Sequence, residues 1–184
     1  EVEKDLPASY YYRLPQTTDH LPRIQILGMA IVQRGAARLD VEQIRNFVQM
    51  FQVDTPLKVG ELWALPLMLR LSVLEALADG LAEITKLEWQ RAPESVVLRR
   101  LISESERSAA GGSAEPESET KVVNSILNLR LFATLNWKTF FETTSVLERI
   151  LRHDPTQAYA QSDFETRNQY RSVIEEFAEG SALA

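Results

Sequence analysis

The segment from about Val59 to Gln90 constrains the fold most, because its apolar residues occupy more than one face of a helix. They crowd its first half, at Leu62, Trp63, Leu65, Leu67, Met68, Leu69 and Leu71. A helix that is hydrophobic on several sides must be covered on several sides. This segment is therefore predicted to be a central helix. Pro66 removes one backbone hydrogen bond, so we expect a kink or a short break there.

Two shorter helices are predicted before the central one. Apolar residues recur at helical spacing from Ile24 to Val32, and Gly35 is a suitable stop. Asp40 and Gln43 have the spacing of a capping box, which predicts a second helix that Pro56 would end.

Helices are also predicted after the central one. One is expected from Pro93 to about Arg107 and another from about Val122. Asn136 can cap a further helix that continues to Leu151.

The end of the chain carries two more helix-start signals. Asp154 followed by Pro155 fits a cap with proline at the first helical position. The last helix is expected to begin near Ser162 or Asp163, with Glu165 placed for a capping box. It is expected to bury Phe164, Tyr170, Val173, Ile174 and Phe177.

Two segments depart from the helical pattern. Residues 5–22 hold Pro7, Pro15 and Pro22 around three consecutive tyrosines, which predicts an extended strap against the core. Residues 108–120 are small and acidic, which predicts a flexible linker or loop.

No segment has the pattern of a strand, so the predicted fold class is all-α. We expect an irregular bundle of about six to eight helices with an extended N-terminal strap. Residues 1–107, which include the central helix, and residues 121–184 are expected to pack as one domain.

The amino-acid composition excludes several classes of partner and of binding site. The 26 acidic residues outnumber the 20 basic ones, and the net charge of −6 argues against a nucleic-acid partner. There is no cysteine, hence no disulfide or thiolate metal site. The apolar stretch from Leu62 to Leu69 is far shorter than the roughly 20 residues that span a bilayer. The first residues, Glu1 to Asp5, lack a signal peptide and an initiator methionine, so we expect a piece of a longer protein.

Several stretches, in one order along the chain, resemble the region of cyclic β-1,2-glucan synthases that precedes their first membrane spans. They are Asp5 to Pro15, Gly60 to Pro66 with Met68 to Arg70, Asn124 to Arg130, Asn136-Trp137, Phe140 to Glu142, Ser145, Glu148, Leu151-Arg152, Asp154-Pro155, Tyr159, Asp163 to Arg167, Tyr170-Arg171 and Gly180-Ser181. The departures are Asn136 and Ser162, where the family more often has Asp and Met, and a shorter central stretch.

The resemblance implies a bacterial inner-membrane parent that builds and cyclises β-1,2-glucan from UDP-glucose, using a divalent metal. Its expected transferase signatures, Asp-x-Asp and Gln-x-x-Arg-Trp, occur nowhere in these 184 residues. The resemblance therefore implies a non-catalytic accessory domain on the cytoplasmic side of the membrane, with no cofactor of its own and with other domains of the parent as partners.

Three arginines and two tyrosines are the candidate ligand-binding residues. Arg130, Arg167 and Arg171 lie in well-matched stretches, and arginine suits bidentate contact with phosphate. The alternative is internal ion pairing with carboxylates such as Glu61, Asp163 or Glu175. Tyr11 and Tyr12 of the strap have aromatic faces on which a sugar can stack.

Four further residues are interpreted as structural. Glu61 lies near a helix start, and Asp163 can cap the last helix. Trp63 and Trp137 fall at helical spacing and are expected in the core. The two histidines, His20 and His153, have no neighbouring ligands that would indicate a zinc site.

Three hypotheses follow. The first is a scaffold domain that docks on the parent through an exposed apolar patch. The second is a module that binds glucan or UDP-glucose through the strap and the three arginines. The third is a hydrolase using Glu61 or Glu148 with Asp163, which requires carboxylates that face each other in an open cleft.

Overall fold

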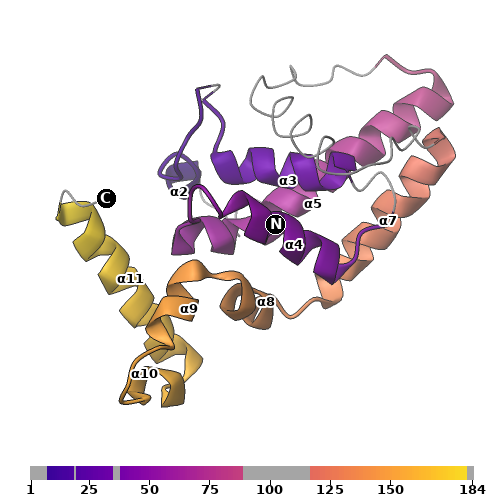
Figure 1. Ribbon diagram of the computed structural model, residues 1–184. Helices are drawn as coiled ribbons and strands as arrows, with labels where there is room; N and C mark the ends of the chain where they lie inside the picture. The colour runs from indigo at the N-terminus through magenta and orange to yellow at the C-terminus, as the bar shows by residue number, and fades with distance from the viewer. Residues whose placement is uncertain (1–7, 19, 35–37, 89–116, 182–184) are drawn as a thin grey trace.

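The computed structural model describes residues 8–18, 20–34, 38–88 and 117–181. Within these ranges the chain is all-α, as predicted, and its helices run in the order shown in Figure 1. They are α2 (Ala8–Tyr11), α3 (Arg23–Arg34), α4 (Val41–Phe51), α5 (Val59–Thr85), α7 (Ser118–Thr134), α8 (Trp137–Thr144), α9 (Val146–Leu151), α10 (Ala158–Gln161) and α11 (Phe164–Gly180). The helix expected from Pro93 to Arg107 lies outside the described residues.

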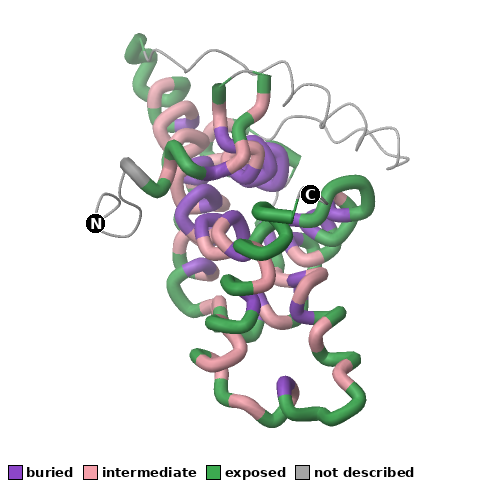
Figure 2. The backbone as a smooth tube through the Cα atoms, turned by 90° about the vertical axis from the view of Figure 1, so that its left-hand side faces the viewer, coloured by how far each residue is buried: buried purple, intermediate pink, exposed green. Residues whose placement is uncertain are grey.

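The long helix α5 is central, as its apolar pattern predicts. Among the described helices, its most extensive contacts are with α3 and α7. Ile24, Leu27, Leu65 and Leu69 are completely buried between these elements. α3 and α5 approach closely at Gly28, where an added β-carbon would lie 3.1 Å from the backbone of Met68. Figure 2 shows the buried residues concentrated in the middle of the molecule.

The helix α5 continues through Pro66, so the short break considered for this position is not present. A proline inside a helix costs about 3 kcal/mol. The neighbouring Leu65 and Leu67 are both buried, and burial of each contributes about 1.5–3 kcal/mol. Their burial therefore offsets the missing hydrogen bond. The helix ends at Lys86, which adopts a left-handed conformation with φ of 55°.

The N-terminal strap is not extended throughout, contrary to expectation. Residues between Pro7 and Pro15 leave room for one helical turn, which forms α2. The chain then turns, and Gln16 pairs with Pro22 in an isolated β-bridge.

The helix α4 begins as predicted and ends early. Asp40 and Gln43 form the expected capping box. The helix stops at Phe51 and not at Pro56, because the buried Gln52 turns its side chain to the neighbouring backbone. Its amide donates to the Thr144 carbonyl at 3.0 Å and accepts from the Leu57 N–H at 3.3 Å.

In the second half of the chain, two predicted helix boundaries were wrong. Residues 118–120 belong to α7 and not to the predicted linker. The single helix expected from Asn136 to Leu151 is divided into α8 and α9. Asn136 caps α8 as predicted, and Ser145 interrupts the run because its hydroxyl accepts from the Glu148 N–H and caps α9.

Asp154 does not cap a helix with Pro155 at its first position, as had been expected. Its carboxylate accepts from the N–H groups of Thr156 and Tyr159, which closes a turn. The next helix, α10, begins only at Ala158. None of the described helices is both long and apolar enough to cross a membrane.

Candidate functional site

The last helix, α11, has three of its apolar residues on the outside, whereas Phe164 packs inward against Trp63. Tyr170, Val173 and Phe177 were expected in the core, yet they are 54%, 46% and 72% exposed. The spacing of three and four residues places them on one face. The buried residue of α11 is Arg171, which is completely covered. This inversion arises because the inward face finds charged partners on neighbouring helices.

The main charged partner of the inward face of α11 is Glu148 on α9. Its side chain is fully buried, and it pairs with the equally buried Arg171. The Tyr159 hydroxyl donates to the same carboxylate oxygen. The Arg171 guanidinium also lies over two aromatic rings, 4.7 Å from the centre of Phe141 and 5.1 Å from that of Phe164. One carboxylate and two aromatic faces thus stabilise the charge of this buried arginine, whose Nε has no hydrogen-bond partner among the described residues.

Two more arginines close the cluster toward solvent. Arg152 donates from Nε to Glu148 Oε1 at 2.7 Å. Arg167 pairs with Glu142 and lies 3.7 Å from Glu148, and the hydrogen bond to Glu142 raises the pKa of Arg167. We name Glu142, Glu148, Arg152, Tyr159, Arg167 and Arg171 the ion cluster.

The ion cluster shifts the pKa values of its two most buried acids in opposite directions. Burial by itself would raise the pKa of Glu148, but hydrogen bonds from Tyr159 and Arg171 and the nearby positive charges outweigh it, so the pKa is lowered. Burial and the hydrogen bond to Glu148 raise the pKa of Tyr159 to about 12. The cluster therefore holds an ionised carboxylate and a neutral phenol.

The carboxylates of the hydrolase hypothesis are held by separate partners. Glu61 is buried at the start of α5, accepts from the Lys58 N–H and pairs with Arg23, whose Nε lies 2.6 Å from its Oε1. Asp163 caps α11 by accepting from the Thr166 N–H, which lowers the pKa of Asp163. Because the cap is Asp163, Glu165 stands one position too early for the predicted capping box. The facing pair that hydrolysis requires is not formed.

The other candidates are dispersed over the molecule. Arg130 on α7 is exposed and forms no ion pair within the described part of the chain. Tyr11 is partly buried and donates to Gln25, whereas Tyr12 is 72% exposed. Ligand binding by these residues, and by Arg167 and Arg171, stays a prediction. For Arg171 it would require breaking the ion pair with Glu148.

Trp63 and Trp137 pack against the core while remaining partly accessible. Trp63 stacks on Phe141 with ring centres 4.8 Å apart. The Trp137 indole donates to the Phe132 carbonyl at 3.0 Å. Trp63 also borders a cavity, which gives it an accessible edge.

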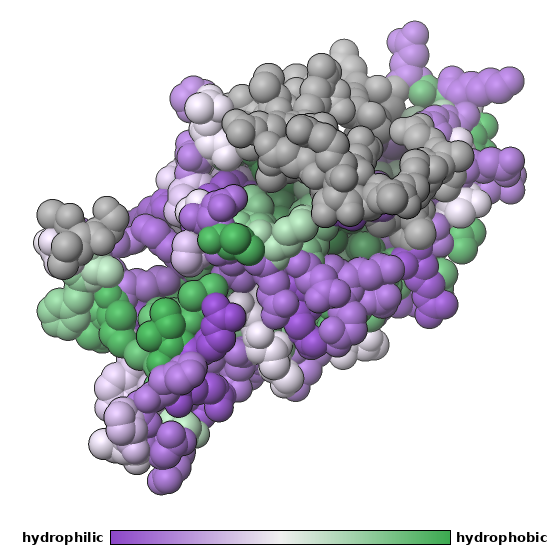
Figure 3. Space-filling model, in the orientation of Figure 1, coloured by the Kyte–Doolittle hydropathy of each residue, from purple (hydrophilic) through white to green (hydrophobic). Residues whose placement is uncertain are grey.

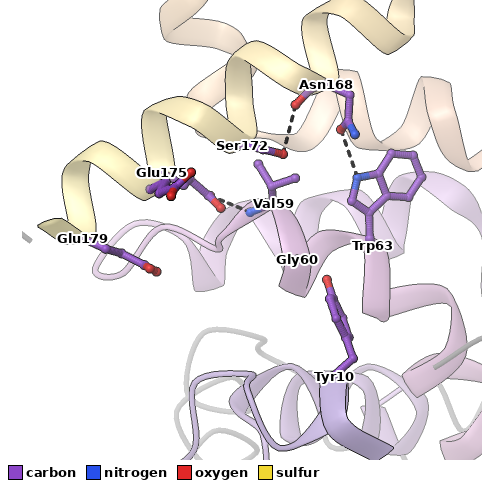
Figure 4. A pocket seen from close by; sticks show the side chains of 9 residues that line it. Tyr10, Val59, Gly60, Trp63, Asn168, Ser172, Glu175 and Glu179 are labelled. Atoms are coloured by element: carbon purple, nitrogen blue, oxygen red, sulfur yellow. Dashed lines mark hydrogen bonds between the residues drawn. The ribbon is translucent and has the colours of Figure 1, made fainter. Parts of the chain in front are cut away.

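That cavity lies between α2, the start of α5 and the inward face of α11, and we name it the α11 pocket. It has a volume of about 380 Å³. Figure 4 shows its lining, which consists of Tyr10, Val59, Gly60, Trp63, Asn168, Ser172, Glu175, Glu176 and Glu179.

Two glutamates beside the pocket fasten α11 to the start of α5. Glu175 accepts from the Val59 N–H at 2.6 Å, and Glu179 pairs with Lys58 at 2.6 Å. A carboxylate at a helix N-terminus interacts favourably with the helix dipole. Burial nevertheless raises the pKa of Glu175, with smaller effects from Glu179 and Glu61.

From the sequence, Glu175 was considered only as an ion-pair partner, and the other pocket residues of α11 were not singled out. Asn168, Ser172, Glu175 and Glu179 recur at intervals of four, three and four, so one helical face carries them all. That polar periodicity was the available signal. Among the described residues, no group of three or more acidic or histidine side chains is arranged to hold a metal ion.

Comparison with known proteins tests the resemblance to cyclic β-1,2-glucan synthases. The chain is 26% identical to the cyclic β-(1,2)-glucan synthase NdvB of Rhizobium meliloti (strain 1021) over 239 residues, covering 98% of this chain and 8% of that protein. The resemblance is thus confirmed, and the chain spans less than a tenth of the relative's length. No protein-family model matches the chain.

Proposed function

We propose that this chain is a non-catalytic helical accessory domain of a membrane-bound cyclic β-1,2-glucan synthase. The outer face of α11 would dock on the rest of that polypeptide. The observation that carries the proposal is the exposed row of Tyr170, Val173 and Phe177 on a helix whose buried residue is the charged Arg171. Figure 3 shows hydrophobic side chains gathered over α11 at the left of the view.

The pattern on α11 supports docking because it is the reverse of what a self-contained domain needs. A helix at the surface of a single domain normally turns its apolar face inward. Here the inward positions are taken by Arg171, Asn168 and Glu175, about half a turn away from Phe177. An exposed apolar face bordered by polar residues is typical of an interaction site.

The length of the relative supports the choice of partner. The matched region is 8% of the synthase, so most of such a protein lies outside the region that this chain represents. The proposal extends to the cytoplasmic side of the inner membrane as the location. In this proposal, UDP-glucose and a divalent metal bind to the transferase part of the parent and not to this domain.

The test places charges on the α11 face in a full-length synthase that contains this domain. Val173→Glu with Phe177→Glu should impair glucan synthesis or loosen the attachment of the domain, seen as faster limited proteolysis between domains. The same double variant of the 184-residue chain should keep its thermal stability, because both side chains are exposed. Ala178→Glu, at an exposed α11 residue that is not three or four positions away from any member of the apolar row, is the matched control.

Normal synthesis and unchanged proteolysis in the double variant would reject the docking face. Loss of stability in the isolated chain would instead show that Val173 and Phe177 serve the fold of this domain.

A further inference from the structure

The α11 pocket is separate from the docking face and has a mixed lining. Tyr10 comes from α2, Gly60 and Trp63 from α5, and Asn168 and Glu175 from α11. Its volume of about 380 Å³ is at the lower end of the range of small-molecule sites, roughly 300–1,000 Å³. It therefore has room for a small ligand or for one end of a longer one.

Several polar groups of the lining are left without partners. The Tyr10 hydroxyl forms no hydrogen bond with any described residue, and Figure 4 shows it pointing toward Gly60 and Trp63. The Asn168 side-chain oxygen accepts from Trp63 and Arg171, both at 3.4 Å, which fixes the amide orientation. Its amide nitrogen has no acceptor within the described part of the chain, so two kinds of donor are available in one cavity.

An acceptor stands beside these donors. One oxygen of Glu175 accepts from the Val59 N–H, and no hydrogen bond to its other oxygen is formed among the described residues. The Ser172 hydroxyl, which donates to the Asn168 carbonyl, can also accept. The lining therefore offers donors and acceptors within the same small volume.

The negative charge of the lining disfavours anionic ligands such as phosphates. Glu175, Glu176 and Glu179 border the pocket. The nearby cations Lys58 and Arg171 are paired with Glu179 and Glu148. Phosphate is anionic and only accepts hydrogen bonds, so the carboxylates would repel it. This disfavours the nucleotide sugar as an occupant.

The free donors disfavour the opposite class. An ammonium ligand only donates, so it would leave the Tyr10 O–H and the Asn168 amide N–H without an acceptor. Sugar hydroxyls both donate and accept, so they can serve both sets of groups. Trp63 adds an apolar surface of the kind that accommodates the C–H face of a sugar ring.

We propose that the α11 pocket binds a neutral saccharide, with Tyr10 and Asn168 donating to sugar oxygens and Glu175 accepting from a sugar hydroxyl. The lining of the pocket contains none of the residues of the docking face. Only the choice of linear β-1,2-glucan as the probe rests on the proposed function.

The experiment is a calorimetric titration of the 184-residue chain with linear β-1,2-glucan, UDP-glucose and spermidine at millimolar concentrations. Binding is expected for the glucan and not for the other two. Tyr10→Phe removes one hydroxyl and should weaken glucan binding about fivefold, the value of one hydrogen bond. Tyr170→Phe, on a 54% exposed tyrosine outside the pocket lining, is the matched control and should leave binding unchanged.

Gly60→Ala is a second, independent variant. A β-carbon at Gly60 would lie 2.6 Å from the Tyr10 hydroxyl, so this hydroxyl must move and binding should fall at least as far as with Tyr10→Phe. Replacing glycine by alanine inside a helix does not weaken the helix itself. Thermal melting of each variant separates loss of binding from loss of folding.

Absence of glucan binding in a folded chain would overturn the proposal, as would binding that both variants leave unchanged. Preference for spermidine or UDP-glucose would also overturn it, since the ligand class would then be ionic. The docking variant Val173→Glu with Phe177→Glu should bind glucan normally. Failure of docking and failure of saccharide binding are therefore distinguishable.

Discussion

The two halves of the molecule are held together by different chemistry. Around α3, α4 and α5 the buried residues are almost all apolar, among them Ile24, Ile44 and Leu65. Around α9, α10 and α11 the buried residues are Glu148, Tyr159 and Arg171. Apolar burial is not directional, whereas a buried ion pair is favourable only with the correct partner in the correct place. The packing of the second region therefore depends more strongly on particular partners. Changing a single atom of the buried ion pair is enough to destabilise it.

The contrast also explains the outer face of α11. Because the ion cluster, the contacts of Glu175 and Glu179 and the packing of Phe164 on Trp63 fasten this helix, the outer residues Val173 and Phe177 are not needed for attachment. They remain available for a partner. In the α3–α5 region most apolar residues of α3 and of the first half of α5 lie in the core, whereas Leu74, Leu81 and Ile84 farther along α5 are exposed.

The largest effect is expected from breaking the ion cluster at its centre. Glu148→Gln leaves Arg171 buried without an anionic partner and should lower the free energy of unfolding by about 3–5 kcal/mol. Denaturant unfolding at neutral pH measures it. The control is Glu165→Gln, whose pair with Lys138 is exposed and should contribute about 0.5 kcal/mol or less. A loss no larger than that of the control would show that the cluster does not hold the second region.

A cavity in the apolar region should have a comparable or slightly smaller effect. Leu65→Ala removes a completely buried side chain and should cost about 2–5 kcal/mol, with little dependence on pH. Leu81→Ala, on an exposed part of the same helix, is the comparison and should cost far less. Equal losses at both positions would contradict the placement of the core.

Glu148 and Glu175 should contribute to stability in different pH ranges. The folded-state pKa of Glu148 is lowered, so its contribution is present above its ordinary pKa of 4.5 and is lost as the pH falls through the lowered value. The folded-state pKa of Glu175 is raised, so its contribution is present below 4.5 and is lost as the pH rises through the raised value.

Unfolding free energies measured from neutral pH to about pH 3 test both statements. Relative to the native chain, Glu148→Gln should flatten the acid limb below pH 4.5, and Glu175→Gln should flatten the curve above it. If each variant altered the other window, the assignment of the two environments would be wrong.

The smallest effect should come from the outer face of α11. Phe177→Ala should change the unfolding free energy by less than about 0.5 kcal/mol, because the ring is 72% exposed. Phe132→Ala, at a fully buried phenylalanine, should cost about 3–5 kcal/mol in the same assay. A large loss at Phe177 would place this ring against the domain itself and remove the basis for docking.

Much of the fold could be predicted because its signals are local. The caps at Asp40, Asn136 and Asp163 act within three residues, so the sequence locates those helix starts. The boundaries that were wrong depend on distant partners. The helix α4 ends where Gln52 reaches Thr144, more than 90 positions along the chain.

The candidate site was less predictable. Internal pairing of Arg167 and Arg171 was weighed from the sequence, but their partners are Glu142 and Glu148 and not the carboxylates that had been considered. The α11 pocket joins α2, α5 and α11, and no spacing within any one of them indicates that the three meet.

The sequence by itself determined that this chain is helical, that α5 is central and that Tyr170, Val173 and Phe177 share one face of the last helix. Only the tertiary structure decided that this face is turned outward. Periodicity fixes which residues lie together on a helix, but not which face is buried when both can be satisfied. The choice depended on Glu148, a residue of another helix whose charge could be buried only where Arg171 neutralises it.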